Sequence, residues 1–334
     1  MLLQKLLLQP RQSSTPYSKK QIDRAGKTLI SNDVSQEEIN QAFAILNSWR
    51  AAHVSPLNTI TSRLTSNNSN VIIVQRLKRL DSIIGKLRRF PQMNLSKMQD
   101  LGGCRVILDN IQQVYQSVIY YEPPNRSFTL KKENDYILNP KTSGYRSYHM
   151  VYQSNDSLLV EIQFRTYLQH LWATALETMS ICMGTNLKLG IGEEDVLRFF
   201  VLVSSLFALK EGTPVCPDTS NNPKELITEI KEINNQFHIL EKLSTMSVEC
   251  NLSNNSKGSY IMQLNTVTHK LETTYFPMNQ AKEAVQLYNH MESLQTPILN
   301  TVLVSSSSFS NLTRTYPNYF LDTRQFLAIL KELL

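Results

Sequence analysis

The sequence lacks the features that mark secreted, membrane-spanning and zinc-binding proteins. It has only four cysteines, which are far apart and form no C-x-x-C pair: Cys104, Cys182, Cys216 and Cys250. We therefore expect reduced thiols and no zinc site. Every apolar run is broken well short of the ~20 residues that cross a bilayer, which predicts no membrane contact. The N-terminus has no small-residue cleavage site of a secretory signal, so we expect a cytoplasmic protein.

Positive charge is concentrated in one part of the chain. The 334 residues carry a net charge of +6, and residues 71–149 alone hold thirteen Lys or Arg against six Asp or Glu. A positive field confined to about a quarter of a chain is typical of a protein that binds a polyanion, either a nucleotide or a nucleic acid. A merely solvated basic face is the alternative that composition leaves open.

Apolar spacing predicts an α/β (α+β) protein with four regions. We expect a helical N-terminal region over residues 1–70, an α/β domain over 71–185, a helical region over 186–250 and a small α+β module over 251–334. Within the first region, Ser35 followed three residues later by Glu38 predicts a capping box at a helix start. Two polar stretches, residues 65–70 and 251–258, are natural boundaries.

The α/β domain contains one predicted helix and three predicted strands. Apolar residues spaced by four and three predict a single helix over Val71–Phe90, with cations on its other faces. Strands are expected at Cys104–Leu108, Tyr148–Gln153 and Leu158–Thr166. The last strand alternates strictly, so its polar side chains share one face: Glu161, Gln163 and Arg165. A helix is expected to follow it directly.

The C-terminal half is predicted to be helical first and mixed afterwards. Helices are expected at Glu193–Glu211 and Lys224–Met246. A hairpin over Tyr260–Phe276, a helix over Asn279–Leu294 and a strand over Ile298–Val304 should follow. A closing helix should begin at Asp322 or Thr323. This order of elements suggests that the module is a unit of its own.

Several polar residues suggest a phosphate and metal site. Lys78, Ser82 and Lys86 are four residues apart and would share a helix face able to grip an oligophosphate. Asp100 precedes a Gly pair and a strand, where it could hold a hard cation or simply form a turn. Glu161 is the most informative residue, because an unpaired buried carboxylate costs several kcal/mol. Either Mg²⁺ shared with Asp100 or an ion pair with Arg165 would compensate it.

The loop from Asn139 to His149 reads NPKTSGYRSYH and is cationic and aromatic, with almost nothing to bury. Arg planes and Tyr rings both stack on nucleobases. Together with paired carboxylates and phosphate-binding cations, this loop completes the set of groups that phosphoryl-type transfer requires.

Four motifs in order resemble those of the synthetase domain of RelA/SpoT-type alarmone synthetases. They are R-x-K-x-x-x-S-x-x-x-K from Arg76, D-x-x-G-x-R from Asp100, DYI-x-x-PK-x-x-GYRS-x-H from Asp135 and VEIQ-x-RT from Val160. The resemblance covers about Val71–Glu177. It implies a nucleotidyltransferase-like mixed β-sheet flanked by helices. It also implies transfer of the β,γ-diphosphate of ATP to a ribose 3′-hydroxyl of GDP or GTP.

The resemblance also implies a role for each matching residue. Arg76 and Arg105 would sandwich the adenine of ATP, and Lys78, Ser82 and Lys86 would hold its phosphates. Asp100 and Glu161 would bind Mg²⁺, and Glu161 would take the proton of the attacking hydroxyl. Tyr145 would stack on the acceptor base, while Lys141, Arg146 and His149 would face acceptor phosphates. The remaining acceptor-binding residues would be Gln163, Arg165 and His170.

The flanking sequences indicate which members of the family this chain resembles. None of the six His is followed by Asp, so the His-Asp signature of the hydrolase half found in long family members is absent. We therefore expect no degradation of the product. Asn47–Thr59 resembles the N-terminal element of single-synthetase-domain proteins, which include toxins and fused toxin–antitoxin proteins of phage defence. In such fusions a C-terminal module restrains the synthetase until a phage protein is sensed, which implies a protein trigger or antitoxin as partner.

Three functions remain open from the sequence. The first is synthesis of (p)ppGpp or its adenine analogue. The second is a toxin that transfers the same diphosphate to the 3′-terminal adenosine of tRNA. It is favoured by cations beyond the motif positions: Arg79, Arg88, Arg89, Lys97, Arg126, Lys131 and Lys132. The third is a non-enzymatic nucleotide sensor, which the presence of Asp100, Tyr145 and Glu161 disfavours. The oligomeric state is not indicated.

Overall fold

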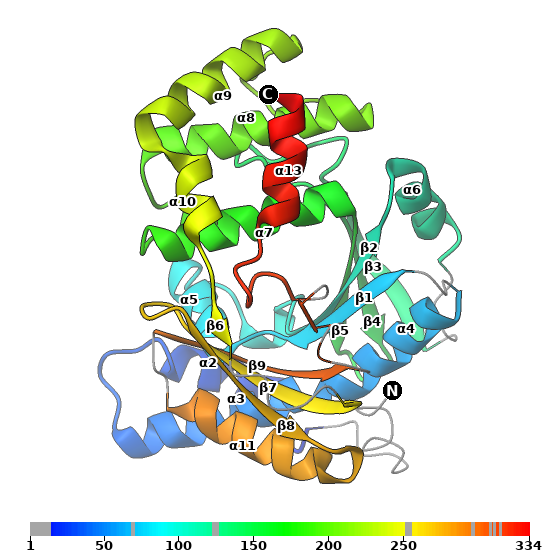
Figure 1. The fold of residues 1–334 in the computed structure, drawn as a ribbon. Helices are drawn as coiled ribbons and strands as arrows, with labels where there is room; N and C mark the ends of the chain where they lie inside the picture. The colour runs from blue at the N-terminus through cyan, green and yellow to red at the C-terminus, as the bar shows by residue number, and fades with distance from the viewer. Residues whose placement is uncertain are drawn as a thin grey trace.

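The computed structural model describes residues 15–67, 71–121, 127–250, 256–294, 298–306, 309, 312–313 and 316–334. Two β-sheets are combined with an N-terminal and a C-terminal group of helices (Figure 1). The first fourteen residues and Arg126 lie outside the described residues, as do parts of both polar boundaries.

The N-terminal helices are α2 (Lys19–Thr28), α3 (Gln36–Ala52) and α4 (Val54–Asn67). The Ser35 hydroxyl accepts a hydrogen bond from the Glu38 amide and the Glu38 carboxylate accepts one from the Ser35 amide, so the predicted capping box is confirmed. Ile22, Leu46 and Trp49 from α2 and α3 form one core with the apolar face of α5 (Leu80–Arg89). This core attaches the N-terminal helices to the first sheet.

The first sheet has five strands in the order β1-β2-β5-β4-β3. The strands are β1 (Ile72–Leu77), β2 (Gly102–Leu108), β3 (Phe128–Asp135), β4 (Tyr148–Ser154) and β5 (Leu159–Thr166). Only β2 and β5 pair in parallel, so the sheet is mixed, and the predicted fold class is confirmed. The 3-10 turn η1 (Leu95–Lys97) follows α5, and α6 (Ile111–Ile119) follows β2. Side chains of α4 and α6 cover one face of the sheet.

The prediction of one helix over Val71–Phe90 is wrong in its first half. Residues 72–77 form strand β1, and only Leu80–Arg89 is helical. The strand is covered on both faces, because Ile73 and Leu77 pack with the α4 side and Val74 packs with the C-terminal module. Apolar residues are therefore needed on both sides of the strand, and their spacing imitates a helical pattern.

The helices α7 (Tyr167–Cys182), α8 (Glu194–Glu211), α9 (Pro223–Phe237), α10 (Ile239–Thr245) and α13 (Arg324–Leu333) share a single apolar core. A 3-10 turn, η2 (Leu187–Leu189), connects α7 to this group. The expected helix Lys224–Met246 is broken at His238, which has a left-handed φ of 53°. The last helix of the chain, α13, contributes Phe326, Leu327 and Leu330 to this core. It packs with the helical group rather than with the second sheet (Figure 1).

The second sheet has the order β6-β8-β7-β9, with β6 (Glu249–Cys250), β7 (Gly258–Asn265), β8 (Lys270–Phe276) and β9 (Leu299–Ser306). The predicted hairpin, strand and helix are confirmed as β7–β8, β9 and α11 (Ala281–Ser293), the last preceded by η3 (Met278–Gln280). We call β6–β9, α11 and the described residues between 309 and 321 the C-terminal module. Its apolar residues pack against Val74 and Ile107 of the first sheet. In the described part of the chain, no helix is long and apolar enough to cross a membrane.

Candidate active site

Strand register gathers the predicted site residues on one face of the first sheet. Arg76 lies opposite Gly103, and Gly103 lies opposite Glu161. In the next row of that face, Arg105 lies opposite Gln163, which lies opposite His149. Paired residues on neighbouring strands point to the same side of a sheet. We call the Arg76 and Arg105 side the arginine half, and the His149, Glu161 and Gln163 side the glutamate half.

Gly103 separates the two halves at the level of Glu161. A Cβ placed on Gly103 would lie 3.3 Å from the Glu161 carbonyl oxygen and 3.9 Å from its Cβ. The first distance is tighter than ordinary van der Waals contact. The absence of a side chain here leaves open space between Arg76 and Glu161.

Both carboxylate oxygens of Glu161 are held by neighbouring side chains. His149 Nδ1 lies 2.9 Å from Oε1, and Gln163 Nε2 donates to Oε2 at 2.7 Å. Burial would raise the pKa of Glu161, but the hydrogen bond from His149 outweighs it and leaves the pKa below its usual value. Glu161 is therefore ionised near neutral pH. The alternative of a Glu161–Arg165 ion pair is not realised among the described residues.

Tyr145 and Lys141 complete the glutamate half. The Tyr145 hydroxyl lies 2.9 Å from His149 Nε2. Tyr136, which was not assigned a role from the sequence, packs edge-on against both rings, with centroid distances of 6.3 Å to Tyr145 and 5.1 Å to His149. The Lys141 ammonium lies 4.3 Å from the Tyr136 ring centre and 5.3 Å from that of Tyr145. Aromatic and cationic groups thus meet beside the Glu161 carboxylate.

Asp100 is bound by two lysines at the start of α5. Lys78 Nζ donates to one carboxylate oxygen at 2.8 Å and Lys86 Nζ to the other at 2.9 Å. Burial would raise the pKa of Asp100, but the charges of Lys78 and Lys86 bring it to about 2. Ser82 is half-buried in the first turn of the same helix. The structure therefore brings Lys78, Lys86 and Asp100 together although Lys78 precedes the helix, and Ser82 lies one turn before Lys86.

The arginine half contains a carboxylate that sequence reasoning did not assign. Burial would raise the pKa of Glu177 on α7, but Lys188, Arg105 and Arg76 together lower it to about 2. Lys188 Nζ donates to Glu177 at 3.1 Å. Burial and the charge of Arg76 lower the pKa of Arg105. Glu177 is thus the counter-charge of the two arginines, and its position on the same helix face as His170, two turns later, was the signal available in the sequence.

Arg165 and His170 form a buried pair beside the arginines. Their side chains meet at 2.6 Å, between an Arg165 terminal nitrogen and His170 Nδ1. Burial, and then the charge of Arg105, lower the pKa of Arg165 well below its usual value. Three buried nitrogens here have no hydrogen-bond partner within the described chain: Arg105 Nε, Arg165 Nε and His170 Nε2. Such orphaned nitrogens suit a ligand rich in acceptor oxygens or ring nitrogens.

Arg146 is placed differently from the prediction that it faces acceptor phosphates. Its guanidinium is 3% exposed and donates to Ser204 Oγ at 3.0 Å and to the Ile137 carbonyl at 3.1 Å. Ser204 in turn donates to the Gly144 carbonyl at 2.6 Å. Arg146 therefore fixes the loop 139–149 to α8. The prediction that Arg146 faces acceptor phosphates is therefore wrong, because its guanidinium donates to buried groups behind the loop.

The donor set fits a hard cation. No group of three or more His, Cys, Asp or Glu able to hold a metal ion occurs in the part of the chain that the structure describes. Asp100 and Glu161 are both ionised, and the charge of Asp100 raises the pKa of Glu161, so the two carboxylates repel each other. Mg²⁺ commonly takes one or two protein carboxylates and completes its shell with water and substrate phosphates. Asp100 and Glu161, without further protein ligands, match this coordination preference of Mg²⁺.

The C-terminal module borders the arginine half. Tyr316 and Tyr319 share an apolar cluster with Val74 and Ile107, which flank Arg76 and Arg105 along their strands. The Tyr316 hydroxyl donates to the Gln75 carbonyl of β1 at 3.2 Å. No sequence signal connected these residues, which are 241 positions apart.

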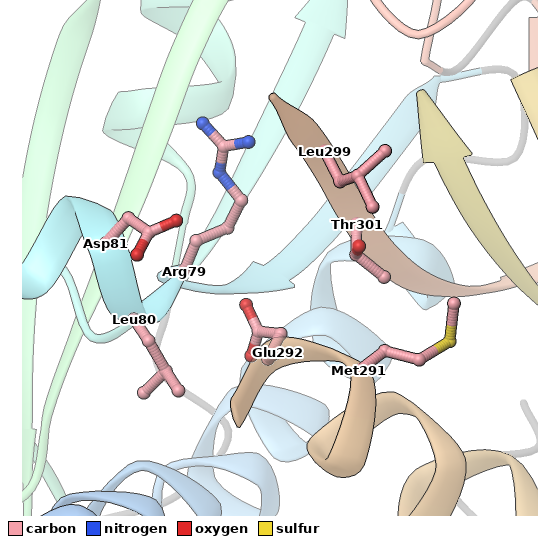
Figure 2. Close-up of a pocket in the computed structure, with 7 residues that line it drawn as sticks. All are labelled: Arg79, Leu80, Asp81, Met291, Glu292, Leu299 and Thr301. Carbon is pink, nitrogen blue, oxygen red and sulfur yellow. The ribbon is translucent and has the colours of Figure 1, made fainter. Parts of the chain in front are cut away.

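Ion pairs and hydrogen bonds fasten this module to the rest of the chain. Arg79 at the start of α5 donates to Asn300 of β9, and Arg50 of α3 pairs with Glu292 of α11. A shallow cleft lies along the seam and is lined by seven residues: Arg79, Leu80, Asp81, Met291, Glu292, Leu299 and Thr301. Figure 2 shows Arg79 and Asp81 on one wall of this cleft and Glu292 and Thr301 on the other.

Comparison with known proteins identifies the central domain. Residues 75–180 match the family described as "Region found in RelA / SpoT proteins". The chain is 33% identical over 127 residues to GTP pyrophosphokinase YjbM of Bacillus subtilis, covering 34% of this chain and 58% of that protein. It is 31% identical over 111 residues to GTP pyrophosphokinase YwaC of the same organism, covering 30% and 52%. The chain thus spans little more than half of these relatives.

A solved structure is also similar. Small alarmone synthetase 2 from Bacillus subtilis has a TM-score of 0.41 and 23% sequence identity, over 50% of this chain and 92% of that one. The family match covers the segment that carries the four motifs and the face of the first sheet described above. Residues 75–180 therefore belong to the region found in RelA/SpoT proteins, and the resemblance read from the motifs is confirmed.

Proposed function

We propose that this protein transfers the β,γ-diphosphate of ATP to a ribose 3′-hydroxyl, with GDP or GTP as the acceptor. One observation carries the proposal: an ionised Glu161 shares a sheet face with Arg76 and Arg105. The relatives YjbM and YwaC are GTP pyrophosphokinases, which supports the same chemistry here.

The proposed reaction assigns one proton and one bond exchange to this face. Glu161 accepts the proton of the 3′-hydroxyl, and the 3′-oxygen forms a bond to the β-phosphorus of ATP. The bond between that phosphorus and the α–β bridging oxygen breaks, and AMP leaves with the electron pair. Mg²⁺, held by Asp100 and Glu161, would neutralise phosphate charge when bound. Lys78 and Lys86 lie beside Asp100 and would bind the phosphates.

The two nucleotides would occupy the two halves of the face. Arg76 and Arg105 offer planar cations for the adenine of ATP, and Glu177 balances their charge. On the glutamate half, the Tyr145 ring is the stacking surface for the acceptor base, and the Lys141 ammonium lies 5.3 Å from the centre of this ring. Arg146 is left out of this assignment because its side chain is buried. His149 is left out as well, because its two ring nitrogens bond to Tyr145 and Glu161 and not to an acceptor phosphate as predicted.

Label transfer tests the proposal directly. The full chain is incubated with Mg²⁺ and γ-labelled ATP, together with GDP, GTP, ATP or bulk tRNA in separate reactions. We expect label in a guanosine product carrying a 3′-diphosphate. Saturable binding of ATP and GDP without transfer to any acceptor would contradict the proposal and favour a nucleotide sensor.

A tRNA acceptor is the second candidate, and the distribution of exposed cations favours it. Seven exposed Lys or Arg lie on three elements that pack together: Lys19, Lys20, Arg24 and Lys27 of α2, Arg88 and Arg89 of α5, and Lys97 of η1. Asp23 of α2 accepts from the Ser96 amide at 2.8 Å, which fixes α2 beside η1. A phosphate backbone would extend along such a surface, whereas one nucleotide would not need it.

The two acceptors are separated by charge reversal on α2. Lys20→Glu combined with Arg24→Glu should abolish label transfer to tRNA and leave transfer to GDP within twofold. Both residues are exposed, so the fold should not change. Equal rates with tRNA before and after the substitutions would exclude this surface as a tRNA track.

We further propose that the C-terminal module restrains the synthetase domain. Tyr316 and Tyr319 pack beside the arginine half, and the Tyr316 hydroxyl bonds to β1. ATP binding at Arg76 and Arg105 would then require the module to move. A protein trigger that binds the module away from the sheet would favour the moved position, because a ligand shifts an equilibrium toward the state it binds better.

Point substitutions test this restraint better than truncation does. Removal of residues 251–334 would also remove α13 and expose the core that Phe326 and Leu330 complete. Tyr316→Ala with Tyr319→Ala leaves α13 in place and should raise the rate of transfer and the affinity for ATP together. Tyr120→Ala, at a residue 75% exposed, is the matched control. A lower rate in the double variant, with an unchanged melting temperature, would argue against restraint.

A further inference from the structure

His149 joins Tyr145 to Glu161 through both of its ring nitrogens. Nδ1 lies 2.9 Å from Glu161 Oε1, and Nε2 lies 2.9 Å from the Tyr145 hydroxyl. Residue His149 is 8% exposed, so water competes little for either contact. Three side chains from the loop, β4 and β5 thus form one continuous hydrogen-bonded chain.

The direction of this chain follows from the chemistry of its ends. An ionised carboxylate can only accept hydrogen bonds, so the His149 Nδ1 must donate to Glu161. In the neutral imidazole the other nitrogen then accepts, and the Tyr145 hydroxyl donates to Nε2. The Glu161 carboxylate therefore sets the tautomer, and the tyrosine hydroxyl holds the other end of the ring in place.

Further contacts make this arrangement rigid. Gln163 holds the second oxygen of Glu161 at 2.7 Å, which fixes the plane of the carboxylate. Tyr136 packs at right angles to His149, with an interplanar angle of 90°. Gly144, next to Tyr145, has a φ of +84°, and a Cβ there would lie 2.9 Å from the Trp172 ring. The loop can hold its position against α7 and α8 only with glycine at this point.

We propose that the Tyr145 hydroxyl, acting through His149, positions Glu161 for proton abstraction. His149 then couples the ring that would stack on the acceptor base to the carboxylate that would take the 3′-proton of the acceptor. Tyr145 has two separable roles: its ring binds the acceptor and its hydroxyl aligns the base. This inference rests on the proposed transfer reaction. A small misplacement of a reacting group costs up to about 100-fold in rate, so the alignment matters.

Tyr145→Phe separates the two roles, because phenylalanine keeps the ring and lacks the hydroxyl. In the full chain, kcat for diphosphate transfer to GDP should fall at least about tenfold. The Kd for GDP, measured by calorimetry without ATP, should stay within twofold. Tyr145→Ala should lose both rate and GDP affinity. An unchanged kcat in Tyr145→Phe would overturn the proposal, and so would equal loss of kcat and GDP affinity.

A double-mutant cycle tests the path through His149. Asparagine places an amide nitrogen near the position of a histidine Nδ1, so His149→Asn keeps a donor for Glu161 but does not reach Tyr145. Tyr145→Phe should therefore have no further effect on kcat in the His149→Asn background. Multiplicative effects of the two substitutions would show that the hydroxyl does not act through His149.

The hydrogen-bonded chain can also be read without turnover. Ring nitrogen chemical shifts of ¹⁵N-labelled protein should show His149 with its proton on Nδ1, and Tyr145→Phe should keep this proton but move the Nε2 resonance toward that of a ring nitrogen that accepts no hydrogen bond. A wild-type ring protonated on Nε2 alone would refute the inference. Absence of transfer by the wild type, with the Nδ1–H tautomer present, would instead contradict the proposed function.

Discussion

The two halves of the same sheet face differ in what satisfies them. On the glutamate half, Glu161 is held by two neighbours at 2.9 and 2.7 Å from within the synthetase domain. On the arginine half, Arg105 Nε and Arg165 Nε are buried without partners in the described chain, and the neighbouring apolar residues are covered by the C-terminal module. The glutamate half is satisfied by side chains of its own sheet. The arginine half keeps buried nitrogens without described partners and lies next to residues that the C-terminal module covers. Substitutions should therefore act locally on the first half and through the module on the second.

The largest expected effect is on the glutamate half. Glu161→Gln keeps the size of the side chain but replaces one acceptor oxygen by an amide donor and removes the base, so kcat should fall by about 10²–10⁴-fold. The melting temperature should change little, because the residue packs no core. Label transfer and thermal unfolding measure the two quantities. Turnover close to that of the wild type would disprove the assignment of Glu161 as base.

The next largest effect concerns the attachment of the module. The Arg50–Glu292 pair is buried, with side chains 2% and 6% exposed, and Arg50 also donates to Tyr288 at 3.0 Å. Removal of one partner of a buried pair costs about 3–5 kcal/mol, whereas replacement of both by apolar residues is often neutral. Glu292→Met alone should therefore make the module protease-sensitive and raise transfer activity.

The matched control for this pair is the double variant Arg50→Met with Glu292→Met. It should recover much of the protease resistance that Glu292→Met loses. The same cycle separates charge from packing, because both variants carry the same methionine on α11. If the double variant were as labile as the single one, the packing of Arg50 on the Tyr288 ring, at 5.4 Å, would be the stronger contact.

A smaller effect is expected from Glu177→Gln on the arginine half. Without the negative charge, Arg76 and Arg105 repel each other and lose their common orientation. The KM for ATP should rise about tenfold, corresponding to ~1.4 kcal/mol, while the Kd for GDP stays unchanged. Steady-state kinetics with each nucleotide varied in turn measure both. A change in GDP affinity alone would show that Glu177 acts on the glutamate half and not on the arginine half.

The last expected effect is a pH dependence of folding stability. Burial lowers the pKa of His53 from 6.5 to about 4. The unfolded chain therefore binds a proton between these values that the folded chain does not, so stability falls as pH decreases from 6.5 toward 4. The loss is at most about 3 kcal/mol. In His53→Asn, urea unfolding should show a flatter pH dependence over this range, and a slope equal to that of the wild type would reject the assignment.

Local sequence patterns correctly predicted the strands and helices that are marked by a single buried face or by a capping residue. The alternation in Leu158–Thr166 located strand β5 and the polar face of Glu161, and Ser35 with Glu38 located the start of α3. The same reasoning failed for β1, because Ile73 and Val74 are buried on opposite faces and no alternation remains. A run of β-branched residues was the better signal there.

Contacts set by distant pairing could not be read from the sequence. The contact between His149 and Glu161 depends on the register of β4 with β5, and the burial of Arg146 depends on Ser204 of α8. Tyr316 reaches β1 only because the second sheet folds back on the first. Motifs identified which side chains matter, whereas the partner of each one was fixed by packing between regions that have no common pattern.

The path of the chain through α10 and α13 limits how the module can move. The polypeptide leaves the helical core after Thr245 and returns to it at Thr323, where the Thr323 hydroxyl donates to the Leu243 carbonyl at 3.0 Å. The points where the chain leaves the helical core and returns to it therefore lie next to each other. A module tethered at both ends cannot diffuse away, so after any displacement its local concentration beside the sheet stays high. Activation by a trigger would then last only as long as the trigger remains bound.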